Sequence, residues 1–113
     1  MAPLPIEVRE YLTPDGESPF GAWFDDLDAQ AAAKVTIAVT RIGQGNLSNV
    51  KGVGSGVFEF RVNFGPGYRL YFGKDVRRVV ILLAGGTKRR QQRDIEDALA
   101  RWQDYKDRKK GKG

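Results

Sequence analysis

Two arginines, a tyrosine and a glutamate are spaced along the chain as they would be on one face of a β-hairpin. Glu59 and Arg61 lie in a run of alternating apolar and polar residues. Arg69 and Tyr71 lie in a second such run, which follows Gly-Pro-Gly at 65–67. Alternate residues of a strand point to the same side, and guanidinium groups suit phosphate oxygens. This face is therefore predicted to handle phosphate.

The alternation also predicts the register of the hairpin. A three-residue loop at 65–67 pairs Phe64 with Tyr68, whereas a two- or four-residue loop would mix the apolar and polar faces. The register places two polar pairs opposite each other: Arg61 with Tyr71, and Asn63 with Arg69. An alternative interpretation is that Glu59 pairs with one arginine and that the face is simply solvated.

A second group of bases lies where the last helix is predicted to begin. Lys88 is followed by three further bases with no acid before Asp94, namely Arg89, Arg90 and Arg93. Cations oppose the dipole at a helix N-terminus, whereas a bound phosphate would gain from the free N–H groups there. Lys88 and Gln91 precede Ile95 by seven and four residues, so both are expected to face the sheet. Gly85-Gly86 would let backbone or ligand approach closely. The alternative is an exposed basic helix start without a ligand.

The composition excludes several classes of chemistry. The chain has 113 residues with no cysteine and no histidine, which removes disulfides, thiolate nucleophiles and Ser-His-Asp triads. Asp25 and Asp26 are adjacent on a short predicted helix, so they are expected to be solvated, and no metal site is predicted. The glycine-rich run 52–56 precedes a predicted strand rather than following one, which argues against a nucleotide-binding loop.

The charge is unevenly distributed along the chain. Its net value is +5, but residues 1–33 carry one base and seven acids, whereas residues 34–93 carry twelve bases and two acids. A basic centre points to a polyanion or an acidic protein as partner, and a solvated basic surface is the alternative. The longest apolar run, 79–84, is too short to span a bilayer, and the N-terminus has no signal-peptide core. A cytoplasmic protein without a membrane partner is expected.

The elements that must position these residues form an α+β arrangement in the order βααβββα. A strand at 6–12 is followed by a short helix with Ser18 as N-cap and by a second helix with Asp28 as N-cap. A glycine-rich connection at about 46–56 leads to the remaining elements: strands at 57–64, 68–72 and 76–84, and a helix at about 88–106. A single domain is expected over 1–107, with a flexible basic tail at 108–113.

Three motifs resemble a known family. They are Glu-x-Arg at 59–61, Gly-Pro-Gly-Tyr-Arg-x-Tyr at 65–71 and Gly-Gly-x-Lys-x-x-Gln at 85–91. Together with the element order, they are similar to the phage-derived addiction module killer protein branch of the RelE/ParE (HigB-like) toxins over nearly the whole chain. Thr87 stands where this branch usually has aspartate, so a carboxylate that would orient Lys88 is missing, although a threonine hydroxyl is able to cap a helix.

The resemblance implies the toxin of a type II toxin–antitoxin pair, which cleaves mRNA on the ribosome without metal or other cofactor. Its partner would be a helix-turn-helix antitoxin in a hetero-oligomer. We expect Arg61 and Arg69 to stabilise the transition state, and Lys88 to hold a phosphate or protonate the leaving oxygen. Glu59 or Lys88 is the candidate base, and Tyr71 a stacking platform or proton donor. The expected RNA-binding residues are Lys51, Arg89, Arg90, Gln91 and Arg93.

Two other functions remain open at this stage. The first is a ParE-type inhibitor of DNA gyrase, which belongs to the same superfamily but acts on a protein. The second is a non-enzymatic nucleic-acid-binding or regulatory domain that uses the basic face for phosphate contact alone. The pairing of Arg61 and Arg69 with an inward-facing Lys88 favours the ribonuclease, because gyrase binding does not require convergent phosphate ligands.

Overall fold

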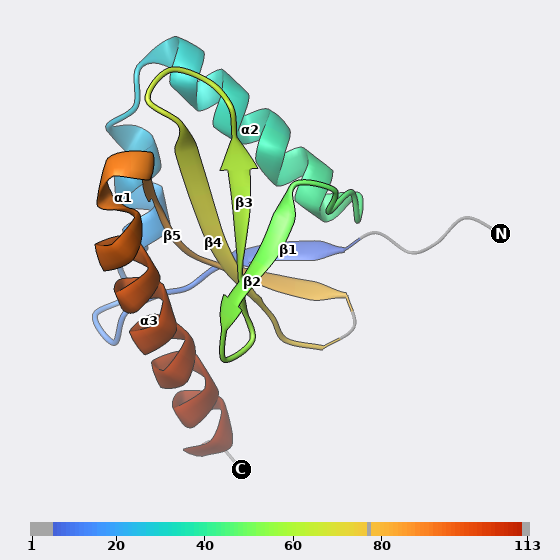
Figure 1. Ribbon diagram of the computed structural model, residues 1–113. Helices are drawn as coiled ribbons and strands as arrows, with labels where there is room; N and C mark the ends of the chain where they lie inside the picture. Colours follow the sequence, from blue (N-terminus) through green and yellow to red (C-terminus); the bar gives the residue numbers. More distant parts are fainter. Residues whose placement is uncertain (1–5, 77, 112–113) are drawn as a thin grey trace, which may run out of the picture.

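A five-stranded sheet with helices on both faces organises the part of the chain that the structure describes, residues 6–76 and 78–111 of a computed structural model (Figure 1). The elements are β1 (Glu7–Glu10), α1 (Pro19–Asp25), α2 (Ala29–Gly43), β2 (Val50–Gly54), β3 (Val57–Val62), β4 (Tyr68–Lys74), β5 (Val79–Thr87), the short 3₁₀ helix η1 (Lys88–Arg90) and α3 (Gln91–Gly111). The strand order is β1-β5-β4-β3-β2, with β1 parallel to β5 and the other neighbours antiparallel. The predicted α+β class is confirmed.

The two faces of the sheet bury separate apolar clusters. On one face, α1 and α2 cover side chains that include Phe60, Leu70 and Phe72. On the other, α3 places Ala98 and Trp102 over a second cluster. Both predicted caps are present, since Ser18 Oγ accepts from Gly21 N at 2.9 Å and Asp28 Oδ1 accepts from Ala31 N at 2.9 Å. Within the described ranges, no helix is long and apolar enough to cross a membrane.

The connection predicted at about 46–56 contains an additional strand, which is a correction to the expected order. β2 pairs with β3 along the edge of the sheet, with an irregularity between Gly52 and Gly54. A tight turn then reverses the chain, with positive φ at Ser55 (53°) and Gly56 (86°). The alternating glycines lack the apolar side chains that mark a strand in a sequence, which is why β2 was missed.

The predicted register of the β3–β4 hairpin is wrong by two residues. Val62 pairs with Tyr68 and Arg61 with Arg69, so the loop has five residues, 63–67. Within it Gly67 N donates to Phe64 O at 3.0 Å, and Gly65 and Gly67 have φ values of 56° and 80° that glycine adopts without strain. Phe64 is thereby removed from the ladder and packs against the core. Because the shift is even, every side chain keeps its predicted face.

Gly85 and Gly86 bring the two helical layers close to the same strand. A Cβ at Gly85 would overlap the Trp23 ring of α1, and a Cβ at Gly86 would overlap Asp94 Oδ2 of α3. A bulge between Leu82 and Ala84, opposite Tyr71 and Phe72, precedes the pair. The two glycines therefore admit side chains of the protein itself rather than the ligand that the sequence suggested.

The last helix begins and ends later than predicted. Residues 88–90 form η1, and α3 runs to Gly111. The predicted flexible tail at 108–113 is thus helical as far as Gly111, while 112–113 lie outside the described residues. Polar contacts hold this end of the helix, because Arg108 Nε donates to Asp104 Oδ2 at 2.9 Å and Lys109 Nζ to Asp75 Oδ1 at 2.5 Å.

Candidate active site

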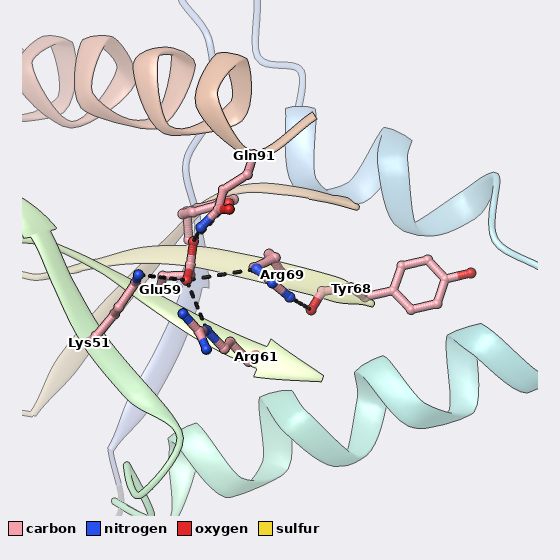
Figure 2. Close-up of polar contacts among 7 residues, drawn as sticks. Lys51, Glu59, Arg61, Tyr68, Arg69 and Gln91 are labelled. Atoms are coloured by element: carbon pink, nitrogen blue, oxygen red, sulfur yellow. Dashed lines mark hydrogen bonds and ion pairs between the residues drawn. The ribbon is translucent and has the colours of Figure 1, made fainter. Parts of the chain in front are cut away.

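A buried carboxylate forms the centre of the site. Glu59 has no exposed surface, and its Oε1 lies near three cationic nitrogens (Figure 2). The distances are 3.4 Å to Arg61 Nε, 3.8 Å to Arg69 Nε and 4.0 Å to Lys51 Nζ. Adjacent strands supply these groups, since Lys51 of β2 pairs with Glu59 of β3 and Arg69 belongs to β4. A buried charge is costly unless it is paired and hydrogen-bonded, so Glu59 gathers the cations around it.

The second oxygen of Glu59 accepts two neutral donors. Tyr71 OH lies 3.1 Å from Oε2, and Gln91 Nε2 lies 2.8 Å from the same atom. One carboxylate oxygen thus faces cations and the other faces neutral groups, so the acceptor capacity of Glu59 is used on both sides. Gln91 is the first residue of α3, and its hydrogen bond joins that helix to the centre of β3.

Tyr71 supports Glu59 from inside the protein. Its side chain is fully buried. Burial raises the pKa of the Tyr71 phenol, as does the neighbouring Glu59 carboxylate, so the hydroxyl remains protonated and donates. A ring without exposed surface cannot stack on a base. The expected role of Tyr71 as a stacking platform is therefore corrected to a buried donor that holds the carboxylate.

Arg69 is a nearly buried cation whose donors are incompletely used. Its side chain is 8% exposed, and Nη1 reaches Tyr68 O at 3.5 Å. Among the described residues its Nε has no hydrogen-bond partner and lies beside Glu59 at ion-pair distance. Buried guanidinium donors normally have partners. Arg69 thus lies between Glu59 and a side that opens to solvent.

That open side is a groove of about 540 Å³. Its lining residues are Arg61, Asn63, Arg69, Lys88 and the loop residues 64–67. Lys88 N donates to Gly67 O at 2.7 Å, which docks η1 against this loop. Arg61, with 47% of its side chain exposed, and Lys88, which is also exposed, join Arg69 there. The three cations predicted to act together do line one groove, although the register that places them differs from the predicted one.

Comparison with known proteins identifies the family. Residues 22–103 match the family described as "Phage derived protein Gp49-like (DUF891)". The chain belongs to this family. A protein of Haemophilus influenzae, described as uncharacterized, is 35% identical over 96 residues, which cover 84% of this chain and 91% of the relative. The matched segment of the Gp49-like chain includes the whole groove and the buried cluster around Glu59.

The other predicted RNA-binding residues of this Gp49-like protein have different positions. Arg89, Arg90 and Arg93 are exposed on η1 and α3, and none of them lines the groove. Gln91 is half-buried and donates to Glu59, and it does not line the groove. Lys51 lines a neighbouring hollow of about 350 Å³, which shares Arg61 and Asn63 with the groove.

Asp94 also belongs to this region of the Gp49-like chain, although it was not among the predicted site residues. Asp94 is 8% exposed and packs on Gly86, which pairs with Arg69 in the sheet. Burial raises the pKa of its carboxyl group, and its Oδ2 has no hydrogen-bond partner among the described residues. The available signal was its spacing, because Asp94 follows Gln91 by three residues and so shares its helical face.

Thr87 does not replace the aspartate that the resemblance led us to expect. It occupies the N-cap position of η1, but its side chain makes no capping hydrogen bond. The start of η1 is held instead through the backbone of Lys88. Over the described ranges, no group of three or more aspartate or glutamate side chains has the arrangement of a metal site.

Proposed function

We propose that this Gp49-like protein is the toxin of a type II toxin–antitoxin system and cleaves mRNA on the ribosome. The observation that carries the proposal is the convergence of Arg61, Arg69 and Lys88 on one groove, with Glu59 buried behind the arginines. Guanidinium groups bind phosphate oxygens through paired donors. The resemblance of the three sequence motifs to RelE/ParE toxins supports the same conclusion.

The reaction is an in-line attack within the RNA. The ribose O2′ forms a bond to the adjacent phosphorus, its proton passes to solvent, and the bond from phosphorus to O5′ breaks. The products are a 2′,3′-cyclic phosphate and a 5′-hydroxyl end. Arg61 and Arg69 stabilise the additional negative charge of the transition state. Lys88 donates a proton to the leaving O5′ and is reprotonated by solvent.

Glu59 and Tyr71 act in this scheme as positioning residues. Neither side chain has exposed surface, so neither reaches an RNA ribose in the groove. Glu59 instead fixes the side chains of the two arginines from behind, at 3.4 Å and 3.8 Å. This arrangement supplies preorganisation, because the cations need not reorganise when charge develops on the phosphate.

The test is to add the purified protein to translating ribosomes and to map mRNA ends by primer extension. New 5′ ends that kinases label without prior phosphatase treatment are expected, since the products carry a 5′-hydroxyl. The Lys88→Ala variant should lose about 10²–10⁴-fold in cleavage rate, whereas Lys110→Ala, on exposed helix far along α3, should cleave normally. Absence of cleavage together with inhibited supercoiling by DNA gyrase would instead support the ParE-type function.

The partner proposed for the protein is a helix-turn-helix antitoxin encoded next to it, which would cover the basic groove in a hetero-oligomer. Charge supports this choice, because a surface that attracts RNA also attracts an acidic protein segment. Co-expression of the neighbouring gene should relieve growth arrest and co-purify its product. Binding by the partner should weaken when Arg61 is replaced by glutamate. Growth arrest that co-expression leaves unchanged would contradict this partner.

A further inference from the structure

A third hollow lies beside the groove, between α2 and the end of β3. Its volume is about 260 Å³, and α2 contributes Lys34, Ile37 and Arg41 to its wall. The opposite wall comes from β3 and the following residues, including Phe60 and Phe64. Pockets for drug-sized ligands measure about 300–1,000 Å³, so this smaller space suits a single flat ring system.

The hollow shares lining residues with the proposed cleavage groove. Arg61 and Asn63 line the 540 Å³ groove, the 350 Å³ hollow beside Lys51, and this third hollow. Asn49 lines two of the three and is fixed beside Arg61, whose backbone N donates to Asn49 O at 3.3 Å. A ligand held between Arg61 and Arg69 has to pass Arg61 and Asn63 to reach this hollow, because α2 packs on the opposite face of the sheet.

The lining of this hollow suits a nucleotide better than a peptide side chain. Ile37 is 48% exposed and, with Phe64, provides an apolar wall. Asn49 and Asn63 are exposed residues of its lining, and an asparagine side chain offers both a donor and an acceptor. Lys34 is held at the rim, with Nζ 5.4 Å from the centroid of Phe64.

The three connected hollows also have a charge that selects their ligand. Six cations line them, namely Lys34, Arg41, Lys51, Arg61, Arg69 and Lys88, and no acidic residue is among the described residues of their linings. Two other hollows on the described surface differ, since Glu10 lines both of them, together with Asp75 in one and Asp25 in the other. A track of cations that contains an apolar slot fits a single-stranded polyanion with bases.

We propose that the hollow between α2 and β3 is the subsite for the nucleotide next to the scissile phosphate. Its base lies against Ile37 and Phe64, and its edge is read by the amides of Asn49 and Asn63. Arg41 contacts the phosphate that follows. The inference rests on the proposed function, because it takes the RNA bound between Arg61 and Arg69 as its starting point.

The test measures binding of 2′-O-methyl RNA hexamers, which lack the attacking hydroxyl and are not cleaved. Fluorescence anisotropy with hexamers of adenosine, cytidine and uridine should show one bound at least about five-fold more tightly than the others, as amide readout of a base edge provides. Asn49→Ala and Asn63→Ala should reduce this preference. Arg41→Ala should weaken all hexamers equally and reduce the salt slope by about 0.7.

The controls separate this inference from the proposed function. Arg41, Asn49 and Asn63 are exposed, so their variants should keep the thermal midpoint of the parent, and Lys110→Ala should bind every hexamer normally. Cleavage on ribosomes is measured with the same variants. If the parent cleaves mRNA but Arg41→Ala and Asn49→Ala bind and cleave like it, the subsite is wrong and the ribonuclease stands. If Arg41-dependent base preference is found without cleavage, the ribonuclease is wrong and the subsite stands.

One further outcome overturns the subsite. If no hexamer binds to the parent, and Arg41→Ala instead loses the antitoxin, the hollow is a protein-binding surface. An unchanged thermal midpoint of Arg41→Ala distinguishes this result from misfolding, and Lys110→Ala should retain the partner.

Discussion

Gln91 Nε2 donates a hydrogen bond of 2.8 Å to Glu59 Oε2, so the first residue of α3 is joined directly to the buried carboxylate that orients two arginines. The position of η1, which immediately precedes α3, is thereby coupled to β3. Lys88 reaches the groove from η1. The distance between Lys88 and the arginines is thus controlled by a side chain that itself does not line the groove.

Replacing Gln91 by alanine should lower both stability and activity. A hydrogen bond to a charged group is worth about 1.5–3 kcal/mol, and we expect the free energy of unfolding in urea to fall by up to this amount. Gln92→Ala, at the exposed neighbouring position, is the matched control and should remain within about 0.5 kcal/mol of the parent. Equal effects of the two variants would contradict the role of Gln91.

Replacing Gly86 by alanine should push α3 away from β5. The added Cβ would overlap Asp94 Oδ2, and overpacking of this kind typically costs about 1–3 kcal/mol. Gly111→Ala, where an added Cβ meets nothing within 4 Å, should be close to neutral. In a double-mutant cycle Asp94→Ala should recover part of the loss, since it removes the overlapping atom. Strict additivity of the two changes would argue against the clash.

The buried carboxyl group of Asp94 should lower the free energy of unfolding at neutral pH. This effect should diminish under mildly acidic conditions. Burial raises the pKa of Asp94 in the folded protein above its ordinary value. The folded state therefore binds the proton more tightly, and the stability that this carboxyl group contributes rises as the pH falls through the raised pKa toward the unfolded one. Above the raised pKa the buried charge is a cost.

The Asp94→Asn variant isolates this effect. It should be more stable than the parent at pH 7, and the advantage should shrink as the pH approaches the ordinary aspartate range. Comparison with the parent is needed because the pKa values of Asp75 and Asp104 are lowered in the folded protein. The stability that these two carboxylates contribute is therefore lost as the pH falls. A difference between parent and variant that does not change with pH, measured by urea unfolding, would show that Asp94 is not perturbed.

Tyr71→Phe should destabilise the fold without removing the chemistry. The variant deletes one donor to Glu59 Oε2, at a cost of about 1.5–3 kcal/mol. Cleavage per folded molecule should fall less than ten-fold, since a buried phenol touches no substrate. Loss of a proton donor would instead cost about 10²–10⁴-fold. A loss of that size in correctly folded Tyr71→Phe protein would return Tyr71 to the reaction.

The local features of this fold were predictable because their causes are local. Ser18 and Asp28 cap helices through residues three positions away. The apolar stripe of α2, from Ala31 to Ile42, follows from helical spacing alone. The shared face of Glu59, Arg61 and Arg69 followed from strand alternation, and the structure has it.

The register and the buried network were not predictable for physical reasons. A two-residue slip of a hairpin leaves every side chain on its predicted face, so alternation cannot distinguish Arg61 opposite Arg69 from Arg61 opposite Tyr71. Turn geometry decides between them. The contact of Gln91 with Glu59 joins residues 32 positions apart, and burial of Tyr71 depends on the packing of α3, neither of which is encoded in local spacing.

The bulge in β5 determines which helix Gly85 and Gly86 each face. Because Leu83 is the extra residue between the pairs Leu82–Phe72 and Ala84–Tyr71, it shifts by one the alternation of everything that follows. Gly85 consequently faces Trp23 and Gly86 faces Asp94. If β5 instead alternated regularly through Leu83 and Ala84, the two glycines would exchange faces, and neither Trp23 nor Asp94 would meet the glycine that now admits it. One unpaired residue thus decides which face of β5 each glycine lies on. The close packing of both helical layers on this strand depends on that placement.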